Sequence, residues 1–413
     1  MPGMRFVDES LLAEHLVHLV DRRPRVVVSG NFATPRVLLS AVDRCLPSYR
    51  LWTLNGQPGL PDRDGVVHET PFVGAGVRSS ERLDYIPARL SLVPRLFART
   101  CIPDVVLLHV APPRDGKVSL GVEVNVLPAA VEQCRRNGGT VIAQVNPDMP
   151  WTYGDGELDV ADVDLAIEAQ ESLLSPAPRS PGAVEAAIGE RVAGLVADRS
   201  TLQLGIGGVP DATLASLADR RHLRMWTEML SDGVLRLDQA GALDPEVPLV
   251  ASFLFGSPEL YAWAHDNPRL QMLRTELTND PGRIAQQPLM TSVNSALQID
   301  LYAQANASWV RGRIYSGFGG QSDFVVGALH STGGQAIVAL PSWHPRADRS
   351  TIVPVLDGPA TSFQHSWVVT EQGAAAITPE PLAAQVRNLV HTAAHPDARA
   401  GLEQDAAERG LLR

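Results

Sequence analysis

The sequence has few cysteines and no long apolar run. Its three cysteines, Cys45, Cys101 and Cys134, are odd in number and far apart, and none forms a CxxC pair or a zinc-ligand spacing with histidine. We therefore expect free buried thiols, with neither a disulfide framework nor a metal site. No segment approaches the roughly 18 apolar residues of a membrane span, and the N-terminus lacks the apolar core of a signal peptide. The sequence accordingly predicts a cytoplasmic protein with no membrane partner.

Positive charge is also in short supply. Lys and Arg number 35 against 46 Asp and Glu, which gives a formal net charge of -11. A nucleic-acid-binding protein normally carries a basic stripe that meets phosphates, so this class is excluded. Binding of an anionic cofactor stays open, because loop amides and a few arginines hold phosphates whatever the net charge.

Apolar runs rich in Val, Ile and Leu alternate with longer amphipathic stretches, a pattern typical of α/β proteins with mostly parallel sheets. The 413 residues exceed what one core usually supports. We expect two domains, residues 1–180 and 181–413, joined by the Ser- and Pro-rich stretch Ser175–Gly182. The expected strands are Arg25–Ser29, Asp104–His109, Thr140–Val145, Leu202–Leu204, Leu249–Phe253, Gln335–Leu340 and Trp367–Thr370.

The two halves begin alike. In each, an apolar strand runs into a glycine, Gly30 or Gly205, and a proline follows five residues later, Pro35 or Pro210, ahead of a helical stretch. This suggests duplicated domains. A strand, a glycine loop and a proline-started helix are common to most βα junctions, so the pattern leaves duplication open.

Two glycine-rich loops follow expected strands in the second half. They are GIGGVPD, from Gly205 to Asp211, and GFGGQSDF, from Gly317 to Phe324. Glycine lets a ligand approach the backbone, and the helix that follows offers free N–H groups to an anion. Neither loop is a dinucleotide or Walker fingerprint. At the carboxyl ends of parallel strands, both loops can converge on one crevice.

Several acids compete as the reactive group. Glu228 follows the expected strand Leu223–Thr227, and Glu371 ends another strand, so placement alone does not choose between them. The other candidate acids are Glu276, Asp300 and Asp323. No HExxH or GxSxG motif is present. Arg346 and Arg349 form a local basic patch that suits either a cofactor phosphate or a solvated loop.

Taken in order, the segments GIGGVPDATL, TEMLSDG, SVNSALQIDLYAQANA, YSGFGGQSDF, GGQAIVALPS and TIVPVL resemble the acetyl-CoA hydrolase/transferase family. The family includes 4-hydroxybutyrate and butyrate–acetate CoA-transferases. The resemblance is strong over the second half and more diffuse over the first, through GNFATP, PFVGAGVRSS and GKVSLGVEVN.

The resemblance implies the class I CoA-transferase fold, two similar open α/β domains with mostly parallel sheets and the active site between them. It places the catalytic glutamate of the TEM-SDG motif on Glu228, at the family's spacing from Gly205. Gln298 stands where some relatives carry Glu, but that spacing favours Glu228. The CoA-binding and oxyanion residues would be Gly205, Ile206, Gly207, Gly208, Val209, Ser316 and Gly320.

The implied function is an acyl-CoA:carboxylate CoA-transferase that works through a glutamyl-CoA thioester. The alternatives are an acyl-CoA hydrolase on the same scaffold and a non-catalytic acyl-CoA-binding protein. No permanently bound cofactor is expected, since coenzyme A is itself part of the substrate. The expected partners are an acyl-CoA and a small carboxylate, with a homodimer as a candidate assembly. Candidate pocket residues from the first half are Asn31, Phe32, Phe72 and Arg78.

Overall fold

The computed structural model describes residues 3–176, 180–356, 358–360 and 364–412. The chain divides into two compact units, Met1–Pro176 with Val250–Thr278, and Ala177–Leu249 with Asn279–Arg413. The expected connector Ser175–Gly182 includes residues 177–179, which lie outside the described residues. The predicted boundary after residue 180 does not account for Val250–Thr278, which belongs to the first unit.

Backbone hydrogen bonds explain this return. The Ser252 carbonyl accepts hydrogen bonds from the N–H groups of Val124 and Asn125 at 3.0 and 3.1 Å. The Thr275 N–H donates to the Asn125 carbonyl at 3.0 Å. Both ends of the returning segment are therefore fixed to one short stretch of the first unit.

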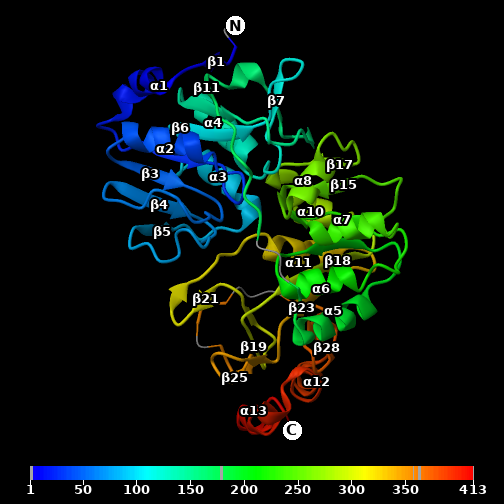
Figure 1. Cartoon of the computed structure of the whole chain (residues 1–413). Coiled ribbons are helices and arrows are strands. Elements are labelled where there is room, and N and C mark those ends of the chain that lie inside the picture. The colour runs from blue at the N-terminus through cyan, green and yellow to red at the C-terminus, as the bar shows by residue number, and fades with distance from the viewer. Residues whose placement is uncertain (1–2, 177–179, 357, 361–363, 413) are drawn as a thin grey trace. The chain divides into compact units, whose positions relative to one another are not determined.

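The first unit is built on an eight-stranded sheet in which all neighbouring strands run parallel (Figure 1). Its central strands are continuous apolar runs that are buried on both faces, as parallel sheets require. In spatial order, the strands are β1 (Arg5–Phe6), β11 (Leu165–Glu168), β8 (Thr140–Val145), β6 (Val105–Val110), β2 (Arg25–Val28), β3 (Tyr49–Trp52), β4 (Val66–Thr70) and β5 (Leu83–Tyr85).

Helices and shorter strands complete this unit. Helix α2 (Arg36–Cys45) packs against β2 in a common apolar core, which includes Val26 and Val28 of the strand and Leu38, Leu39 and Val42 of the helix. The helices are α1 (Glu9–Leu16), α2 (Arg36–Cys45), α3 (Val93–Phe97), α4 (Leu127–Arg136), α8 (Pro258–Ala264) and α9 (Thr275–Thr278). The shorter strands are β7 (Lys117–Ser119), β9 (Tyr153–Gly154), β10 (Glu157–Asp159), β15 (Leu249–Ala251), β16 (Phe253–Phe255) and β17 (Leu270–Met272).

The second unit has a six-stranded sheet that is parallel except for its last pair. In spatial order, the strands are β13 (Arg224–Met225), β12 (Thr201–Leu204), β18 (Met290–Ser295), β23 (Gln335–Ala339), β27 (Trp367–Val369) and β28 (Ala374–Ala376). The helices are α5 (Ala183–Leu195), α6 (Gly208–Ala215), α7 (Asp232–Gln239), α10 (Pro281–Ala285), α11 (Gln321–His330), α12 (Leu382–Asn388) and α13 (Pro396–Glu408).

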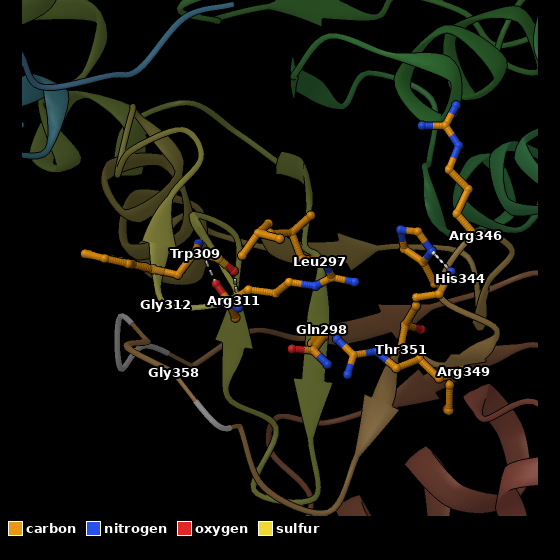
Figure 2. A pocket seen from close by; sticks show the side chains of 14 residues that line it. Leu297, Gln298, Trp309, Arg311, Gly312, His344, Arg346, Arg349, Thr351 and Gly358 are labelled. Atoms are coloured by element: carbon orange, nitrogen blue, oxygen red, sulfur yellow. Dashed lines mark hydrogen bonds between the residues drawn. The ribbon is translucent and has the colours of Figure 1, made fainter. Parts of the chain in front are cut away.

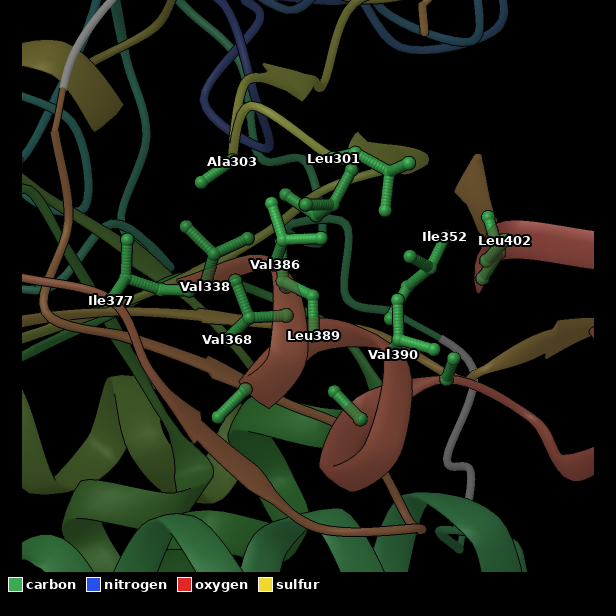
Figure 3. Close-up of a cluster of buried hydrophobic side chains, with 14 of the residues drawn as sticks. Leu301, Ala303, Val338, Ile352, Val368, Ile377, Val386, Leu389, Val390 and Leu402 are labelled. Carbon is green, nitrogen blue, oxygen red and sulfur yellow. The ribbon is translucent and has the colours of Figure 1, made fainter. Parts of the chain in front are cut away.

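A buried apolar cluster joins the sheet of this unit to its C-terminal helices. Val338 of β23 and Val368 of β27 pack with Val386, Leu389 and Val390 (Figure 3). Small antiparallel pairs lie outside the main sheet. The remaining strands are β14 (Met229–Ser231), β19 (Gln298–Asp300), β20 (Ala305–Asn306), β21 (Trp309–Val310), β22 (Arg313–Ile314), β24 (Trp343–His344), β25 (Arg349–Ser350) and β26 (Ile352–Val353).

The two sheets share one strand order. In the first unit the run β3-β2-β6-β8-β11, and in the second the run β13-β12-β18-β23-β27, both follow the pattern 2-1-3-4-5. This order places the topological switch point after β2 and after β12, where ligands bind in such sheets. Gly30 and Gly205, the glycines at which the two halves of the sequence begin alike, follow these two strands. The prediction of mostly parallel α/β sheets is confirmed, and the shared order supports similar domains.

Most expected strands occur within one or two residues of their predicted bounds. The exception is Leu249–Phe253, which breaks at Ser252 into β15 and β16 because the Ser252 carbonyl bonds to another segment. Among the residues described, no helix combines the length and apolar character that a bilayer crossing needs. In the same part of the chain, no group of three or more His, Cys, Asp or Glu side chains is arranged so that it could hold a metal ion.

Candidate active site

The first glycine loop leaves β12 at the switch point of the second sheet. Gly205, Ile206 and Gly207 connect this strand to α6. Gly207 has a φ of 121°, a conformation that favours glycine. No side chain or backbone atom fills the space beside Gly205 or Gly207, so a ligand can approach the loop closely.

Glu228 lies three residues beyond the neighbouring strand, β13, which pairs with β12 in parallel. The Trp226 N–H donates to the Leu202 carbonyl at 3.1 Å and continues this pairing toward Glu228. The loop from Gly205 and the glutamate therefore follow adjacent strands at the same edge of the sheet. Glu228 is surrounded mainly by protein atoms, yet part of its surface is exposed. The residue is thus partly exposed, and its carboxylate is poorly solvated.

Two groups hold the Glu228 carboxylate. The Asn279 amide nitrogen donates to Glu228 Oε2 at 3.0 Å. The backbone N–H of Gly320, the residue that precedes α11, donates a second hydrogen bond to the carboxylate. A Cβ atom on residue 320 would overlap both the Glu228 oxygen and the Asn279 amide. Position 320 therefore has to be glycine while this arrangement persists.

These surroundings control the protonation of Glu228. Burial raises its pKa, and the Asp323 carboxylate nearby acts in the same direction. The hydrogen bonds from Asn279 and Gly320 act against burial, and the net pKa is raised to about 7. Near neutral pH, Glu228 is therefore present both as the protonated acid and as the carboxylate. Few water molecules stabilise the carboxylate.

Two family models match the chain, the acetyl-CoA hydrolase/transferase N-terminal domain over residues 59–176 and the C-terminal domain over residues 256–406. The 4-hydroxybutyrate coenzyme A transferase of Clostridium kluyveri is 38% identical over 427 residues, covering 98% of this chain and 98% of the relative. This chain belongs to the acetyl-CoA hydrolase/transferase family. The protein is therefore an enzyme of the CoA-transferase and acetyl-CoA hydrolase type.

Other proteins also match over nearly the whole chain. The succinyl-CoA:acetate/propanoyl-CoA:succinate CoA transferase of Fasciola hepatica is 34% identical, over 99% of this chain and 90% of its own. The crystal structure of RipA from Yersinia pestis superimposes with a TM-score of 0.89 at 27% identity. The match covers 98% of this chain and 100% of RipA. Glu228 and the loop from Gly205 lie between the two segments that the family models match, and these near-full-length similarities span them.

The acids that competed with Glu228 in the sequence have other partners. The Glu371 carboxylate accepts hydrogen bonds from the Ser342 N–H and hydroxyl. Burial opposes ionisation of Glu371, but these bonds outweigh it and lower its pKa. Glu276 pairs with Arg274 at 2.7 Å, and Asp300 accepts the N–H groups of the tight turn that follows it. All three therefore stabilise local structure.

The structure assembles part of the predicted site. Gly320 contacts Glu228 directly, whereas Ser316 faces a hairpin and donates from Oγ to the Ala307 carbonyl at 3.1 Å. The second glycine loop follows β22 of this hairpin, not a strand of the main sheet as the convergence argument assumed. Asn279 was absent from the sequence prediction. It stands in a turn before Asp280 and Pro281, and nothing there distinguishes it from an ordinary turn residue.

Two of the candidate pocket residues of the first unit, Asn31 and Phe32, make contacts that the structure shows within that unit. The Asn31 amide donates to Glu123 Oε2 at 2.9 Å, and Asn31 Oδ1 accepts from the Asn55 amide at 2.7 Å. Phe32 stacks on Phe255 with their ring centroids 4.3 Å apart. Asn31 and Phe32 therefore have partners within the unit. No pattern in the sequence pointed to Glu123.

Proposed function

We propose that this enzyme transfers coenzyme A from an acyl-CoA to a small carboxylate, with Glu228 as the nucleophile and a glutamyl-CoA thioester as the intermediate. The observation that carries the proposal is the partly accessible Glu228 carboxylate, held by Asn279 and Gly320 with its pKa raised to about 7. Poor solvation makes a carboxylate more nucleophilic, and the two donors fix its orientation.

In the first half-reaction, Glu228 Oε1 attacks the thioester carbon, the carbon–sulfur bond breaks, and CoA leaves as a thiolate. An acyl-glutamyl anhydride remains. The thiolate then attacks the side-chain carbonyl carbon of Glu228, and the acyl group departs as a free carboxylate. The product is the glutamyl-CoA thioester, and no metal or redox group takes part in these steps.

The second half-reaction reverses these steps with a new acid. The acceptor carboxylate attacks the glutamyl-CoA carbonyl and expels the thiolate, which then attacks the acyl carbon of the new anhydride. Each attack on Glu228 places negative charge on Oε2, which accepts the Asn279 hydrogen bond. Such a donor stabilises a transition state by about 3 kcal/mol. Asn279 and Gly320 therefore act as an oxyanion site for the enzyme's own carboxyl group, and the Gly207–Val209 loop is proposed to serve the substrate thioester.

Transferase and hydrolase differ in whether a carboxylate or water opens the glutamyl-CoA. Two relatives that match nearly the whole chain are both named as CoA transferases, which favours transfer. Acyl-CoA hydrolysis is the alternative within the same family. The homodimer and the cytoplasmic location stay predictions.

Intact-mass spectrometry tests the covalent step. Protein incubated with acetyl-CoA should gain the mass of one CoA less water, and excess acetate should remove it. Glu228→Gln keeps the size of the side chain and should abolish the adduct. Glu190→Gln, an exposed glutamate of α5, is the control and should form the adduct normally. An adduct on Glu228→Gln protein would overturn the proposal. Thioester consumption measured without an acceptor separates hydrolysis from transfer.

A further inference from the structure

A pocket of about 690 Å³ opens in the second unit, outside the main sheet. Two antiparallel hairpins, β21–β22 and β24–β25, supply most of its wall. The start of β19, Asn306 of β20, Thr351 just before β26, and Gly358 supply the rest. The volume lies in the usual range for small-molecule sites. It is lined by Leu297, Gln298, Asn306, Trp309, Val310, Arg311, Gly312, His344, Arg346, Ala347, Arg349, Ser350, Thr351 and Gly358.

The charged side chains among the described lining residues have one sign. Arg311, Arg346 and Arg349 contribute guanidinium groups, and none of the lining residues that the structure describes is an aspartate or a glutamate. Over the described part of the chain, none of the three forms an ion pair with an acid. Arg25, by contrast, is neutralised by Glu69 at 2.6 Å. Three unneutralised cations around one pocket of a protein with net charge -11 indicate a site for a polyanion.

Figure 2 shows how the arginines are arranged. Arg311 and Arg349 extend toward each other beside Gln298, whereas Arg346 points away on the other side of His344. Two guanidinium groups that converge next to an amide provide several N–H donors in a small volume. This arrangement suits a phosphate group, whose oxygens accept such donors in pairs.

Local structure fixes these donors. Arg311 and Gly312 have φ values of 49° and 73°, as in the two-residue type I′ turn that joins β21 to β22. The turn therefore places Arg311 at the tip of the hairpin. His344 pairs with Arg349 across β24 and β25, and its Nδ1 accepts the Ala347 N–H at 3.0 Å. In the neutral ring, the proton then lies on Nε2, which makes this atom another donor.

The hairpin also connects the pocket to the candidate active site. The strand β22 leads directly into the loop that ends at Gly320, which contacts Glu228. From Arg311 to Gly320 the chain advances nine residues, a span of at most about 30 Å. The pocket and Glu228 are therefore joined by one short segment, and a ligand with a phosphorylated end and a reactive thioester has to span no more than this distance.

We propose that this pocket binds the phosphorylated nucleotide end of coenzyme A, and that Arg311 and Arg349 hold its 3′-phosphate. The 3′-phosphate is a monoester and carries more charge than either phosphate of the diphosphate bridge, so it takes the place where two guanidinium groups converge. The assignment rests on the proposed function for the choice of ligand. It adds a determinant by which the enzyme distinguishes CoA from the form without the 3′-phosphate.

Calorimetric titration with CoA and with 3′-dephospho-CoA tests the assignment. The wild-type protein should bind CoA about tenfold to a hundredfold more tightly, since a charge-assisted contact contributes that much. Arg311→Gln and Arg349→Gln should lose most of this preference by weakening CoA binding alone. Arg387→Gln, an exposed arginine of α12 outside the pocket lining, should keep it. Unchanged preference in both pocket variants would overturn the proposal.

The experiment separates this proposal from the covalent mechanism. CoA without an acyl group binds without turnover, so a missing glutamyl-CoA adduct leaves the titration meaningful. Adenosine 3′,5′-bisphosphate is the probe for a separate nucleotide site and should compete with CoA. Binding of this probe without competition would also overturn the proposal. Melting temperatures provide the folding control, and removal of one of three like charges should not lower them.

Discussion

The Asn279 side-chain amide and the Glu228 carboxylate are 51 residues apart in the sequence and form a hydrogen bond of 3.0 Å. Asn279 is completely buried, so its position is fixed by packing. The amide contacts Oε2 and leaves Oε1 as the oxygen for attack on a substrate. This contact thus contributes to both the orientation and the acidity of the proposed nucleophile.

Asn279→Ala should lower kcat for CoA transfer by about a hundredfold, as the loss of one oxyanion donor does in other enzymes. The hydrogen bond lowers the Glu228 pKa, so its loss should raise that pKa further and move the pH–rate profile toward higher pH. Steady-state kinetics across pH measure both effects. Asn388→Ala also removes an amide contact, the partly buried hydrogen bond to the Ala376 carbonyl, and should leave the pH–rate profile in place. A rate loss without any pH shift would contradict the assigned contact.

Gly320→Ala should lower kcat/KM by at least about a hundredfold, because the added methyl group displaces the Glu228 carboxylate and the Asn279 amide. Crowding of this kind also destabilises a protein by about 1–3 kcal/mol. Enzyme assays and urea unfolding measure the two effects. Gly401→Ala in α13 meets open space and should stabilise the helix by roughly 0.5–1 kcal/mol. Normal activity in Gly320→Ala protein would contradict the close contact.

The sequence predicted the elements around the site better than the contacts within it. Strands such as Thr140–Val145 were recognisable because continuous apolar runs are typical of buried parallel strands. Glu228 and Gly320 were picked out together through their motifs. The contact between them depends on where α11 begins relative to β13, and no pattern within either segment encodes that distance.

Two groups of residues show the limit of sequence patterns most clearly. Asn279 belongs to an ordinary turn before α10, and only the fold brings its amide to Glu228. The pocket arginines Arg311 and Arg349 lie on separate hairpins, so a local basic patch was visible only at Arg346 and Arg349. Only the tertiary structure shows that arginines from separate hairpins line the same pocket.

The reaction should speed up as Glu228 loses its proton. Only the carboxylate attacks a thioester, and the pKa of Glu228 is raised to about 7 by burial and by Asp323. We therefore expect kcat/KM for acetyl-CoA to rise between pH 6 and 8 with a one-proton midpoint near 7, and to level off above it. Initial rates in constant-ionic-strength buffers measure the profile. A flat profile, or one that falls over this range, would contradict a carboxylate nucleophile.

Glu123 in the first unit should make the protein less stable as pH rises. Its carboxyl group is 2% exposed, and burial raises its pKa to about 8 against the opposing hydrogen bond from Asn31. The unfolded chain releases this proton near pH 4.3, whereas the folded chain keeps it until about pH 8. The contribution of Glu123 to the free energy of unfolding is thus greatest below its pKa in the unfolded chain. It falls by about 1.4 kcal/mol per pH unit until the pH reaches its pKa in the folded protein.

Glu123→Gln removes this titration and keeps an oxygen that accepts from the Asn31 amide. The variant should therefore be more stable than the wild-type protein at pH 8, and the difference should shrink or reverse at pH 5. Urea unfolding at the two pH values measures it. Glu190→Gln, with its exposed carboxylate, should show no such dependence. An equal effect of Glu123→Gln at both pH values would mean that the folded protein does not hold this proton, and that the Asn31 amide faces a buried anion.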